Sequence, residues 1–467
     1  MKKIILSVAL SCAINAVTAQ DLQKQVEYNR GSLYTIMISS DKLSGSENED
    51  IVTKAFDRMP LPDKYNDHNL KNRHVDITKV EVTKEEIEGF TPKKNGVGGL
   101  IQKGRSFLKK NTSSTQVGVM SDEEKIARIN KYFQENHIAN QLVGKWFNKS
   151  PKMNEMNGKK SHFNSKLVEE RAMYNASKED IDNADISRNG IAKIKSNGTL
   201  DLLSHTFVLA TVYRYLSYDE LAATVQAGAE VTKQLGFTGV GELANLGASV
   251  FGDFTDGYWI TAESYLFQLE WNDDIQETFF DTYWDAADTK EFDTTPLFKL
   301  KFVAMTHSLA RAGKVLAKDA DAATKEKLDF AMARATGKSI AKLQKLHPDF
   351  NILAPLYVSL DGKHCYAYIG KKEDVKSEDK FEVVRPKTQK DGSVTLEDGV
   401  TITVAKGKVW DNRAGAGIAD LEESKEDADI DKNAKYTTFE DKPKSEWALG
   451  GYYVRQIYRK DSRKKTK

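Results

Sequence analysis

Hydrophobic and polar positions follow two different periods along the chain, and these periods predict strands and helices in separate stretches. Runs of β-branched and aromatic residues predict buried strands. Four such runs lie in the first two thirds of the chain, at residues 32–38, 206–216, 258–271 and 297–306. The wider apolar spacing of helices occurs between them, so we expect strands and helices to be mixed in one body.

The clearest helix signal begins at Ser121, which forms a capping-box pattern with Glu124. Apolar positions continue from there to Trp146, and we expect a break near Asn136-His137. Other helical patterns cover residues 166–186, a run of small residues that begins at Asp219, and residues 322–346. The last of these stops where a proline follows at position 348, because proline cannot continue a helix.

From residue 351 onward the pattern changes to short strands separated by Asp-Gly, Gly-Lys and acidic turns. This spacing predicts a small antiparallel barrel or sandwich. The predicted fold class is therefore α+β, with a helical and mixed α/β body followed by a small C-terminal antiparallel β barrel or sandwich. The expected segments are a signal peptide at 1–19, an N-terminal strand and loop-rich segment at 20–120 with a linker near 92–120, a helical region at 121–200, an α+β domain at 201–350, a C-terminal β module at 351–458 and a basic tail at 459–467.

The N-terminus has the pattern of a cleavable export signal. Two lysines precede an apolar stretch at residues 4–17, and small residues lead to Ala19, so we expect cleavage between Ala19 and Gln20. A retained membrane anchor fits less well, because a span needs roughly 20 apolar residues and the N-terminal segment is interrupted by Ser7, Ser11, Asn15 and Thr18. Cys12 offers a second route, lipidation as a lipoprotein, but Ala9 stands where the lipobox normally has leucine. We therefore expect a protein of the periplasm or cell surface, soluble or peripherally attached, with no transmembrane span after cleavage.

Composition excludes some classes of partner. The chain has 467 residues, 40% hydrophobic and 29% charged, so it can bury sizeable cores. Its formal charge of +1 becomes −1 once Lys2 and Lys3 are removed, and nothing in that balance indicates a nucleic-acid partner. Cys365 is then the only cysteine, so the mature chain has no internal disulfide, and this thiol fits a core position. The oligomeric state is left open.

The densest set of metal-ligand residue types lies between positions 63 and 76. Imidazole and carboxylate groups together suit zinc or a similar divalent ion, and the candidate ligands are His68, His74, Asp67 and Asp76. Their spacing matches no standard closed site, and a turn-rich surface loop contains the same residues. No other cofactor is expected, and the sequence contains neither H-E-x-x-H nor G-x-S-x-G, so catalytic residues stay unknown.

Other short patterns fit structural interpretations better than functional ones. Gly337-Lys338-Ser339 resembles the end of a phosphate-binding loop, but it lies inside a helical pattern. Gly239-Val240-Gly241 lacks the strand that must precede a dinucleotide-binding turn. Alternating Asp427, Asp429 and Asp431 lack the glycine and glutamate of a calcium loop.

Acidic residues near Trp271 lie among many aromatic residues, as they do in glycosidases, but an aromatic helix face with solvated acids has the same composition. Thr294, in Asp293-Thr294-Thr295, matches a three-residue pattern for O-glycosylation of exported proteins. The basic tail is expected to be a solvated end, with contact to anionic polymers or lipid as the alternative.

Four segments resemble an uncharacterised exported protein family of Bacteroidetes: SLYTIMI, MPLPDKYNDHNL, SHTFVLATVYRYLSYDE and SYLFQLEWND. This resemblance implies an exported protein of Bacteroidetes origin, and it assigns no activity. The segments IGKKEDVKSEDKFEVVRP and VTITVAKGKVW resemble the small β module of flagellar-assembly and curli-export envelope proteins, although residues 376–379 replace the glycine-bearing turn of that module. The second resemblance implies a structural or assembly role.

These observations favour an exported cell-envelope protein of non-enzymatic binding, scaffold or assembly type, whose partner is an envelope protein or a surface polymer. The alternative is an exported, metal-assisted hydrolase that uses the segment from His68 to Asp76 or the acids near Trp271. A third hypothesis is shallow membrane insertion through the glycine-rich residues 236–257. Convergence of the histidines and acids on one cavity would favour the hydrolase, and liposome flotation of the mature chain would test the membrane insertion.

Overall fold

The structure is a computed structural model of the chain. It describes residues 31–39, 47–60, 62, 65–90, 120–156, 159–175, 202–219, 257–313, 322–346, 352–388, 394–397, 399–418, 421 and 433–457. The expected signal peptide with Ala19, Gln20 and Cys12, the linker near 92–120, the glycines at 239–241, the aspartates at 427–431 and the basic tail lie outside the described residues.

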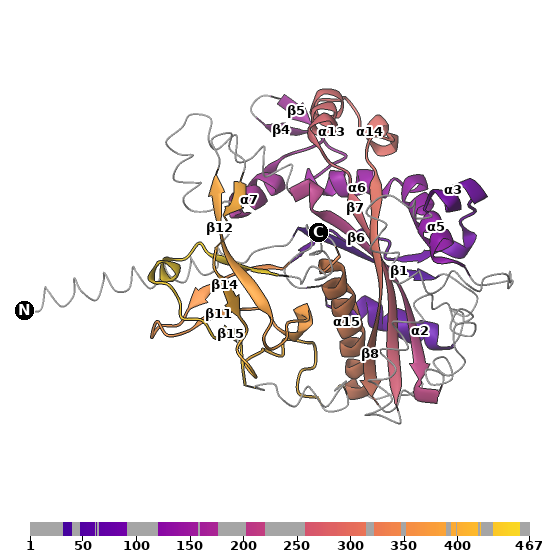
Figure 1. Cartoon of the computed structure of the whole chain (residues 1–467). Coiled ribbons are helices and arrows are strands. Elements are labelled where there is room, and N and C mark those ends of the chain that lie inside the picture. The colour runs from indigo at the N-terminus through magenta and orange to yellow at the C-terminus, as the bar shows by residue number, and fades with distance from the viewer. Residues whose placement is uncertain are drawn as a thin grey trace, which may run out of the picture.

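A mixed six-stranded sheet forms the centre of the body (Figure 1). Its strands are β1 (Ser32–Ser39), β2 (Asn66–Asp67), β3 (His74–Asp76), β6 (Thr206–Ser217), β7 (Tyr258–Leu269) and β8 (Leu300–Gly313). The order is β2-β1-β6-β7-β8, and β3 pairs with β1 beside β2. β1 runs parallel to β2, β3 and β6, whereas β6, β7 and β8 form an antiparallel meander. The four predicted strand runs are therefore all present in one sheet.

Helices cover both faces of this sheet. α2 (Glu47–Arg58) and α15 (Ala322–Gln344) pack on one face, against residues such as Met37 and Tyr213. α5 (Asp122–Glu135) and α6 (Ile138–Trp146) pack on the other face, against Ile36 and Val208. Since successive strand residues point to opposite faces, a strand covered on both sides must be apolar at nearly every position. The continuous apolar runs of β1 and β6 have this cause.

Two local signals read from the sequence determine the start of α5 and its separation from α6. The Ser121 side chain accepts a hydrogen bond from the Glu124 backbone N–H at 3.1 Å, which caps α5 as expected. His137 has a left-handed backbone with φ of 49°, so the helix ends there and α6 begins in a new direction. The expected break near Asn136-His137 is confirmed.

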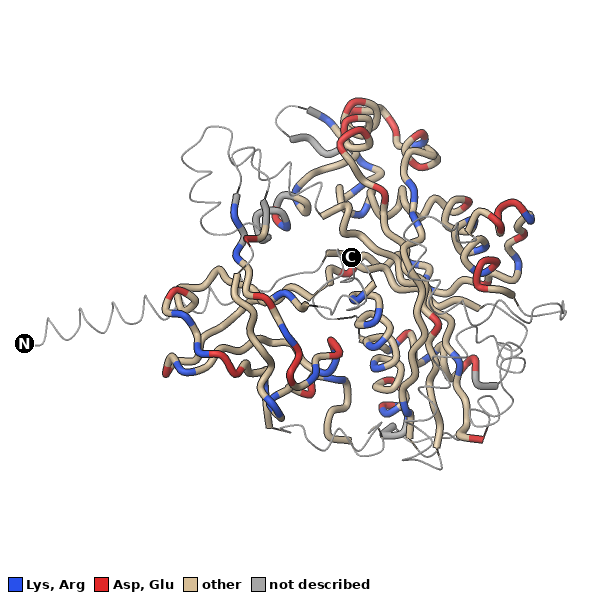
Figure 2. The backbone as a smooth tube through the Cα atoms, viewed as in Figure 1, with Lys and Arg blue, Asp and Glu red and all other residues tan. Residues whose placement is uncertain are grey.

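Short elements close the α5–α6 side of the sheet. They are the 3₁₀ turn Ile77–Lys79, α3 (Lys84–Gly89), β4 (Asn154–Met156), β5 (Lys159–Ser161), α7 (Lys166–Asn175), α13 (Asp273–Thr278), the π turn Phe279–Tyr283 and α14 (Lys290–Thr294). Acidic residues gather at α13 and α14, at the end of the body away from the C-terminal strands (Figure 2).

The C-terminal residues form a separate β-rich module with its own apolar core. It contains β9 (Leu353–Pro355), β10 (Tyr357–Val358), β11 (Cys365–Ala367), the 3₁₀ turn Lys371–Glu373, β12 (Lys380–Thr388), β13 (Val394–Glu397), β14 (Thr401–Thr403), β15 (Thr437–Phe439), the 3₁₀ turn Ser445–Leu449 and β16 (Tyr453–Gln456). β10, β11 and β15 form one antiparallel sheet, and β9, β12, β13, β14 and β16 form another. The α+β class is confirmed, and the described strands of this module form two sheets without closing into a barrel.

Elements from three of the expected segments meet around the central sheet. β1 comes from the segment 20–120 and pairs with β6 of the segment 201–350, while α5 and α6 of the segment 121–200 cover the sheet between them. Strand pairing thus joins residues that are far apart in the chain. Among the described helices, none is both long and apolar enough to cross a membrane.

α15 lies between the sheet and the C-terminal module and holds the two together (Figure 1). The buried Arg334 guanidinium donates to the backbone carbonyls of Ala414, Gly415 and Leu421. Near the end of the helix, Lys345 forms an ion pair with Asp374 of the module. An Arg that satisfies three carbonyls fixes the path of the chain it contacts, so the module has a defined position on the body.

Candidate functional site

The candidate metal ligands His68 and His74 lie on opposite faces of the sheet. His68 is buried and its ring packs on Trp146 of α6, with 4.4 Å between ring centroids. His74 lies on the α2 side, where its Nε2 is 2.7 Å from an Asp57 carboxylate oxygen. Because a continuous strand layer separates the two imidazoles, they do not share a ligand site.

Both carboxylates of the same candidate set have local structural partners. Asp67 accepts a hydrogen bond from the Asn69 backbone N–H at 2.8 Å, and Asp76 caps the following 3₁₀ turn through Thr78. Within the described residues, no three His, Cys, Asp or Glu side chains are arranged to hold a metal ion. The structure therefore separates the four residues that the sequence placed close together.

His68 itself is an unusual group. Neither ring nitrogen has a hydrogen-bond partner among the described residues. Burial, together with the nearby positive charges of Lys145 and Arg171, lowers the pKa of His68 to about 3. The imidazole is thus neutral and acts as a flat ring that packs on Trp146, although its two polar nitrogens are not satisfied.

The acids near Trp271 are solvated, and the aromatic side chains between them form a core. Asp273 and Asp274 are exposed in the first turn of α13, where carboxylates favourably oppose the helix dipole. Phe279 is fully buried and stacks on Phe147 with 4.7 Å between ring centroids. The described acids of this segment do not converge on a cavity, so the geometry matches an aromatic packing face.

Gly337-Lys338-Ser339 lies in the middle of α15, as the sequence indicates. Lys338 donates to the Leu309 carbonyl at 2.8 Å, and Lys342 donates to the His307 carbonyl at 2.6 Å. β8 is the last strand of the sheet, and its outer carbonyls need partners. These lysines therefore cover a sheet edge and do not form a phosphate loop.

The glycosylation candidate Thr294 and the cysteine Cys365 both lie in described elements. Thr294 is exposed at the end of α14, with its hydroxyl donating to the Lys290 carbonyl at 3.1 Å. Cys365 is buried in β11, and burial raises the pKa of its thiol to about 11. The exposed Thr294 hydroxyl is accessible for modification. The Cys365 thiol is a core group, as expected for the single cysteine that follows the expected signal peptide.

A group of aromatic side chains covers the outer face of the three-stranded sheet in the C-terminal module. We call it the tyrosine face, and its members are Tyr357, Tyr366, Tyr368, Trp410 and Tyr436. Strand alternation places these rings, because Cys365 and Ala367 point into the core while Tyr366 and Tyr368 point outward. Tyr368 and Tyr436 are 42% and 41% exposed, which is high for aromatic side chains packed together.

The rings of the tyrosine face support one another. Tyr366 lies 4.3 Å from Tyr436 and 5.5 Å from Tyr357 between ring centroids, and the last pair is stacked. Tyr368 stands nearly perpendicular to Tyr366 and Tyr436. Burial and the neighbouring Tyr368 raise the pKa of Tyr366, so its hydroxyl stays protonated as a hydrogen-bond donor. The result is a preformed, uncharged surface that combines ring faces with hydroxyl groups.

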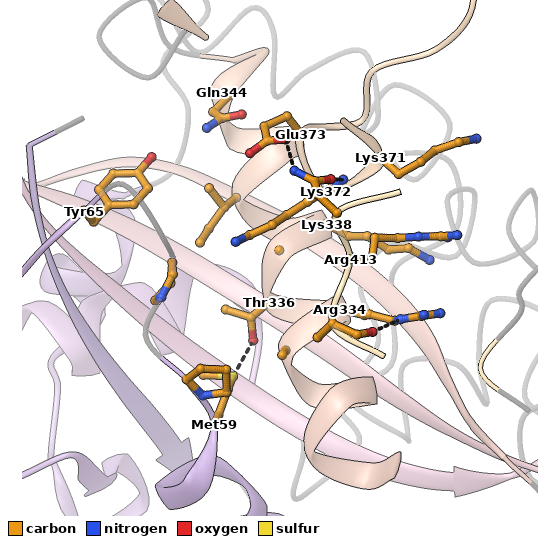
Figure 3. A pocket seen from close by; sticks show the side chains of 17 residues that line it. Met59, Tyr65, Arg334, Thr336, Lys338, Gln344, Lys371, Lys372, Glu373 and Arg413 are labelled. Carbon is orange, nitrogen blue, oxygen red and sulfur yellow. Dashed lines mark hydrogen bonds between the residues drawn. The ribbon is translucent and has the colours of Figure 1, made fainter. Parts of the chain in front are cut away.

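A cavity of about 170 Å³ lies where α15, the chain after α2 and the C-terminal module meet (Figure 3). Its lining includes Tyr65 on the body, Gln344 of α15, and Lys372 and Glu373 of the module. Figure 3 shows Tyr65 across the cavity from Lys372 and Glu373. The turn that carries the last two residues is fixed, since Glu373 accepts hydrogen bonds from the Gly370 N–H and from the Asn412 amide, both at 2.8 Å.

Charged groups are also buried on the α5 side of the sheet. The Lys125 ammonium lies 2.6 Å from a Glu263 oxygen, and His307 lies 3.6 Å from the other oxygen of that carboxylate. Burial opposes ionisation of Glu263, but Lys125 and His307 outweigh it and hold the pKa well below its ordinary value. Tyr265 donates a hydrogen bond to the same carboxylate, and burial raises the pKa of Tyr265.

Sequence reasoning missed the cavity and the buried charges, because each assembles residues from distant segments. A signal did exist for the tyrosine face, in the alternation of HCYAYIG with small residues inward and tyrosines outward. A charged residue inside the apolar run of β7, Glu263, was the corresponding signal for the buried pair. No protein-family model and no curated protein sequence matches the chain.

Proposed function

We propose that this is an exported cell-envelope protein with a non-enzymatic binding role, and that the tyrosine face of its C-terminal module binds a surface polysaccharide. The two antiparallel sheets of that module enclose one apolar core, which supports a sandwich-type binding module. The observation that carries the proposal is the exposure of Tyr368 and Tyr436 within a packed group of rings.

The chemistry of these side chains favours a sugar polymer. An aromatic ring has a partial negative charge on its face, which attracts the polarised C–H groups of a sugar ring. Tyrosine hydroxyls next to the rings can exchange hydrogen bonds with sugar hydroxyls. Such side chains have few rotatable bonds, so binding costs little conformational entropy. A shallow face of this kind suits a polymer that lies along it.

The test uses the mature full-length chain and purified surface polysaccharide from the producing cells, measured by affinity electrophoresis. The variant Tyr368→Ala/Tyr436→Ala should reduce binding at least ~10-fold, since truncation of an aromatic hot-spot side chain at an interface costs about 2 kcal/mol or more. Leu449→Ala is the matched control, because Leu449 is 88% exposed on the same module outside the tyrosine face. The proposal fails if the double variant binds as the parent does, or if the control loses binding equally.

A further inference from the structure

The charged side chains that line the cavity between α15 and the C-terminal module already interact within the protein. Arg334 donates to three backbone carbonyls, and Arg413 forms an ion pair with Asp411 at 2.8 Å. Glu373 accepts two hydrogen bonds at 2.8 Å. The lining lysines also interact with other groups of the chain: Lys338, Lys371 and Lys372. Because these charges are engaged, the cavity does not require a counter-ion, and an uncharged ligand suits it.

The amide of Gln344 is the polar group of this lining that calls for a ligand. Gln344 is the last residue of α15 and is 1% exposed, and its Oε1 has no hydrogen-bond partner among the described residues. A buried acceptor of this kind has lost its water without gaining a donor, which is unfavourable. Figure 3 shows Gln344 at one end of the cavity, with Tyr65 on one side and Glu373 on the other. A ligand in the cavity can therefore satisfy Gln344 if it carries an N–H or O–H group.

The lining next to Gln344 is apolar. Ile340 lies one helical turn before Gln344, so both side chains occupy the same face of α15, and both line the cavity together with Met59 and Pro62. A sugar hydroxyl that donated to Gln344 would place the neighbouring hydroxyls of its ring against this apolar surface, where they lose hydrogen bonds with water. An acetamido group avoids this cost, because it combines one N–H donor with a methyl group. Its carbonyl oxygen matches a lining that is rich in basic donors.

The rest of the lining limits the size of the ligand. The volume of about 170 Å³ is below that of sites for drug-sized ligands, which are ~300–1,000 Å³. Tyr65 provides an aromatic ring in the lining, and the face of such a ring attracts the polarised C–H groups of a sugar. The cavity therefore suits a single sugar unit that carries an acetamido group.

We propose that this cavity binds an N-acetylated amino sugar. The acetamido N–H would donate to Gln344 Oε1, the methyl group would lie against Ile340, and the sugar ring would lie against Tyr65. Such a ligand contacts the body and the module together, so its binding stabilises their docking. The residues of the tyrosine face do not line the cavity, and neither proposal depends on the other.

The experiment is isothermal titration of the mature full-length chain with N-acetylglucosamine, glucose and glucosamine. These sugars differ in the group at one ring carbon, which is an acetamide, a hydroxyl or an ammonium group. N-acetylglucosamine should bind at least ~10-fold more tightly than either of the others, because one hydrogen bond and one buried methyl group together contribute about that factor. Equal affinity for the three sugars would overturn the proposal. The absence of N-acetylglucosamine binding would also overturn it, and would mean that water satisfies Gln344.

A further probe distinguishes a sugar from a peptide. N-acetylalanine amide carries the same acetamido group without a sugar ring, so it should bind more weakly than N-acetylglucosamine by the contribution of the ring against Tyr65. If it binds as tightly as N-acetylglucosamine, the ring is not recognised and the assignment to a sugar is wrong.

Two variants assign the binding to the cavity. Gln344→Met removes the amide at nearly constant volume and should weaken N-acetylglucosamine binding ~10-fold. Gly337→Leu should abolish binding, because Gly337 lines the cavity and a Cβ there would have the Lys372 Cγ, at 3.7 Å, as its nearest contact, so the longer side chain extends into the cavity. Leucine also has a higher helix propensity than glycine, so this change does not weaken α15.

Gly89→Leu is the matched control, because Gly89 ends the helix α3 outside the cavity lining and a Cβ there would meet no atom within 4 Å. Circular dichroism and urea unfolding verify that each variant is folded. Unchanged affinity in both cavity variants, or an equal loss in Gly89→Leu, would overturn the proposal.

Discussion

The Lys125 ammonium and the Glu263 carboxylate form an ion pair of 2.6 Å inside the body, with side chains only 1% and 3% exposed. Lys125 comes from the first turn of α5, and Glu263 comes from the middle of β7. Removing either charge alone leaves the other buried without its counter-ion, which costs far more than an exposed pair contributes.

Glu263→Gln should therefore lower the free energy of unfolding by about 3–5 kcal/mol, as expected when one partner of a buried pair is removed. Replacing both, in Lys125→Met/Glu263→Leu, should restore much of that loss because neither charge of the pair is then left without the other. Urea denaturation measures all variants, and Lys54→Ala, which breaks the exposed pair with Asp50, is the control. Equal effects of Glu263→Gln and Lys54→Ala would show that the buried pair is not important for stability.

His68 should make the protein less stable as the pH falls. Its folded-state pKa is about 3, and its ordinary value is 6.5, so between these values the unfolded chain binds a proton that the folded chain does not. The neutral His68 therefore makes its full contribution to the free energy of unfolding above pH 6.5. That contribution is lost as the pH falls towards 3, with a slope of ~1.4 kcal/mol per pH unit.

The variant His68→Phe keeps a ring against Trp146 and removes this titration. Urea unfolding between pH 6 and pH 4.5 should then give a slope smaller by ~1.4 kcal/mol per pH unit. Leu449→Ala provides the control, since Leu449 is 88% exposed and has no titratable group, so this variant should keep the parent slope. An unchanged slope in His68→Phe would mean that His68 is accessible to protons in the folded state.

Two glycines near the junction allow a matched test of how the C-terminal module is docked. Gly415 and Gly417 both have positive φ, of 64° and 83°, so alanine is strained at each by ~1–2 kcal/mol. A Cβ at Gly415 would also lie 2.6 Å from Phe330 of α15, whereas a Cβ at Gly417 would meet no atom within 4 Å.

Gly415→Ala should consequently destabilise the protein by about 1–3 kcal/mol more than Gly417→Ala, which is the usual cost of overpacking. Urea denaturation gives the difference, and hydrogen exchange should show reduced protection in the segment around Arg413. If the two variants are equally stable, the contact between Gly415 and α15 does not hold the module.

Cys365, the only cysteine of the expected mature chain, should react slowly with thiol reagents. Its pKa of about 11 compared with the ordinary 9.0 leaves ~100-fold less thiolate near pH 8, and the thiolate is the reacting species. The rate with an aromatic disulfide reagent should rise at least ~100-fold in urea. A fast reaction of the folded protein would indicate that β11 opens readily.

Local chemistry in the sequence was sufficient to predict the four long strands of the body and the helices α5, α6 and α15. Ser121 caps its helix through one backbone N–H three residues away, and the break at His137 depends on its immediate neighbours. The alternation that exposes Tyr366 and Tyr368 likewise needs only the geometry of one strand. β8 was predicted at residues 297–306 but extends to Gly313, because Ser308 and Ala310 pack against α15, a contact that no local pattern contains.

Tertiary structure alone decided which residues meet. His68 and His74 are six positions apart in sequence, yet the sheet separates them, while Lys125 and Glu263 are 138 positions apart and in direct contact. The cavity needs Tyr65, Gln344 and Lys372 from three distant segments. The spacing of apolar residues along helices and strands and the hydrogen bonds of helix caps are short-range effects, so the sequence by itself determines them. The pairing of strands and the docking of the C-terminal module depend on long-range packing, and that packing brought the candidate site residues together.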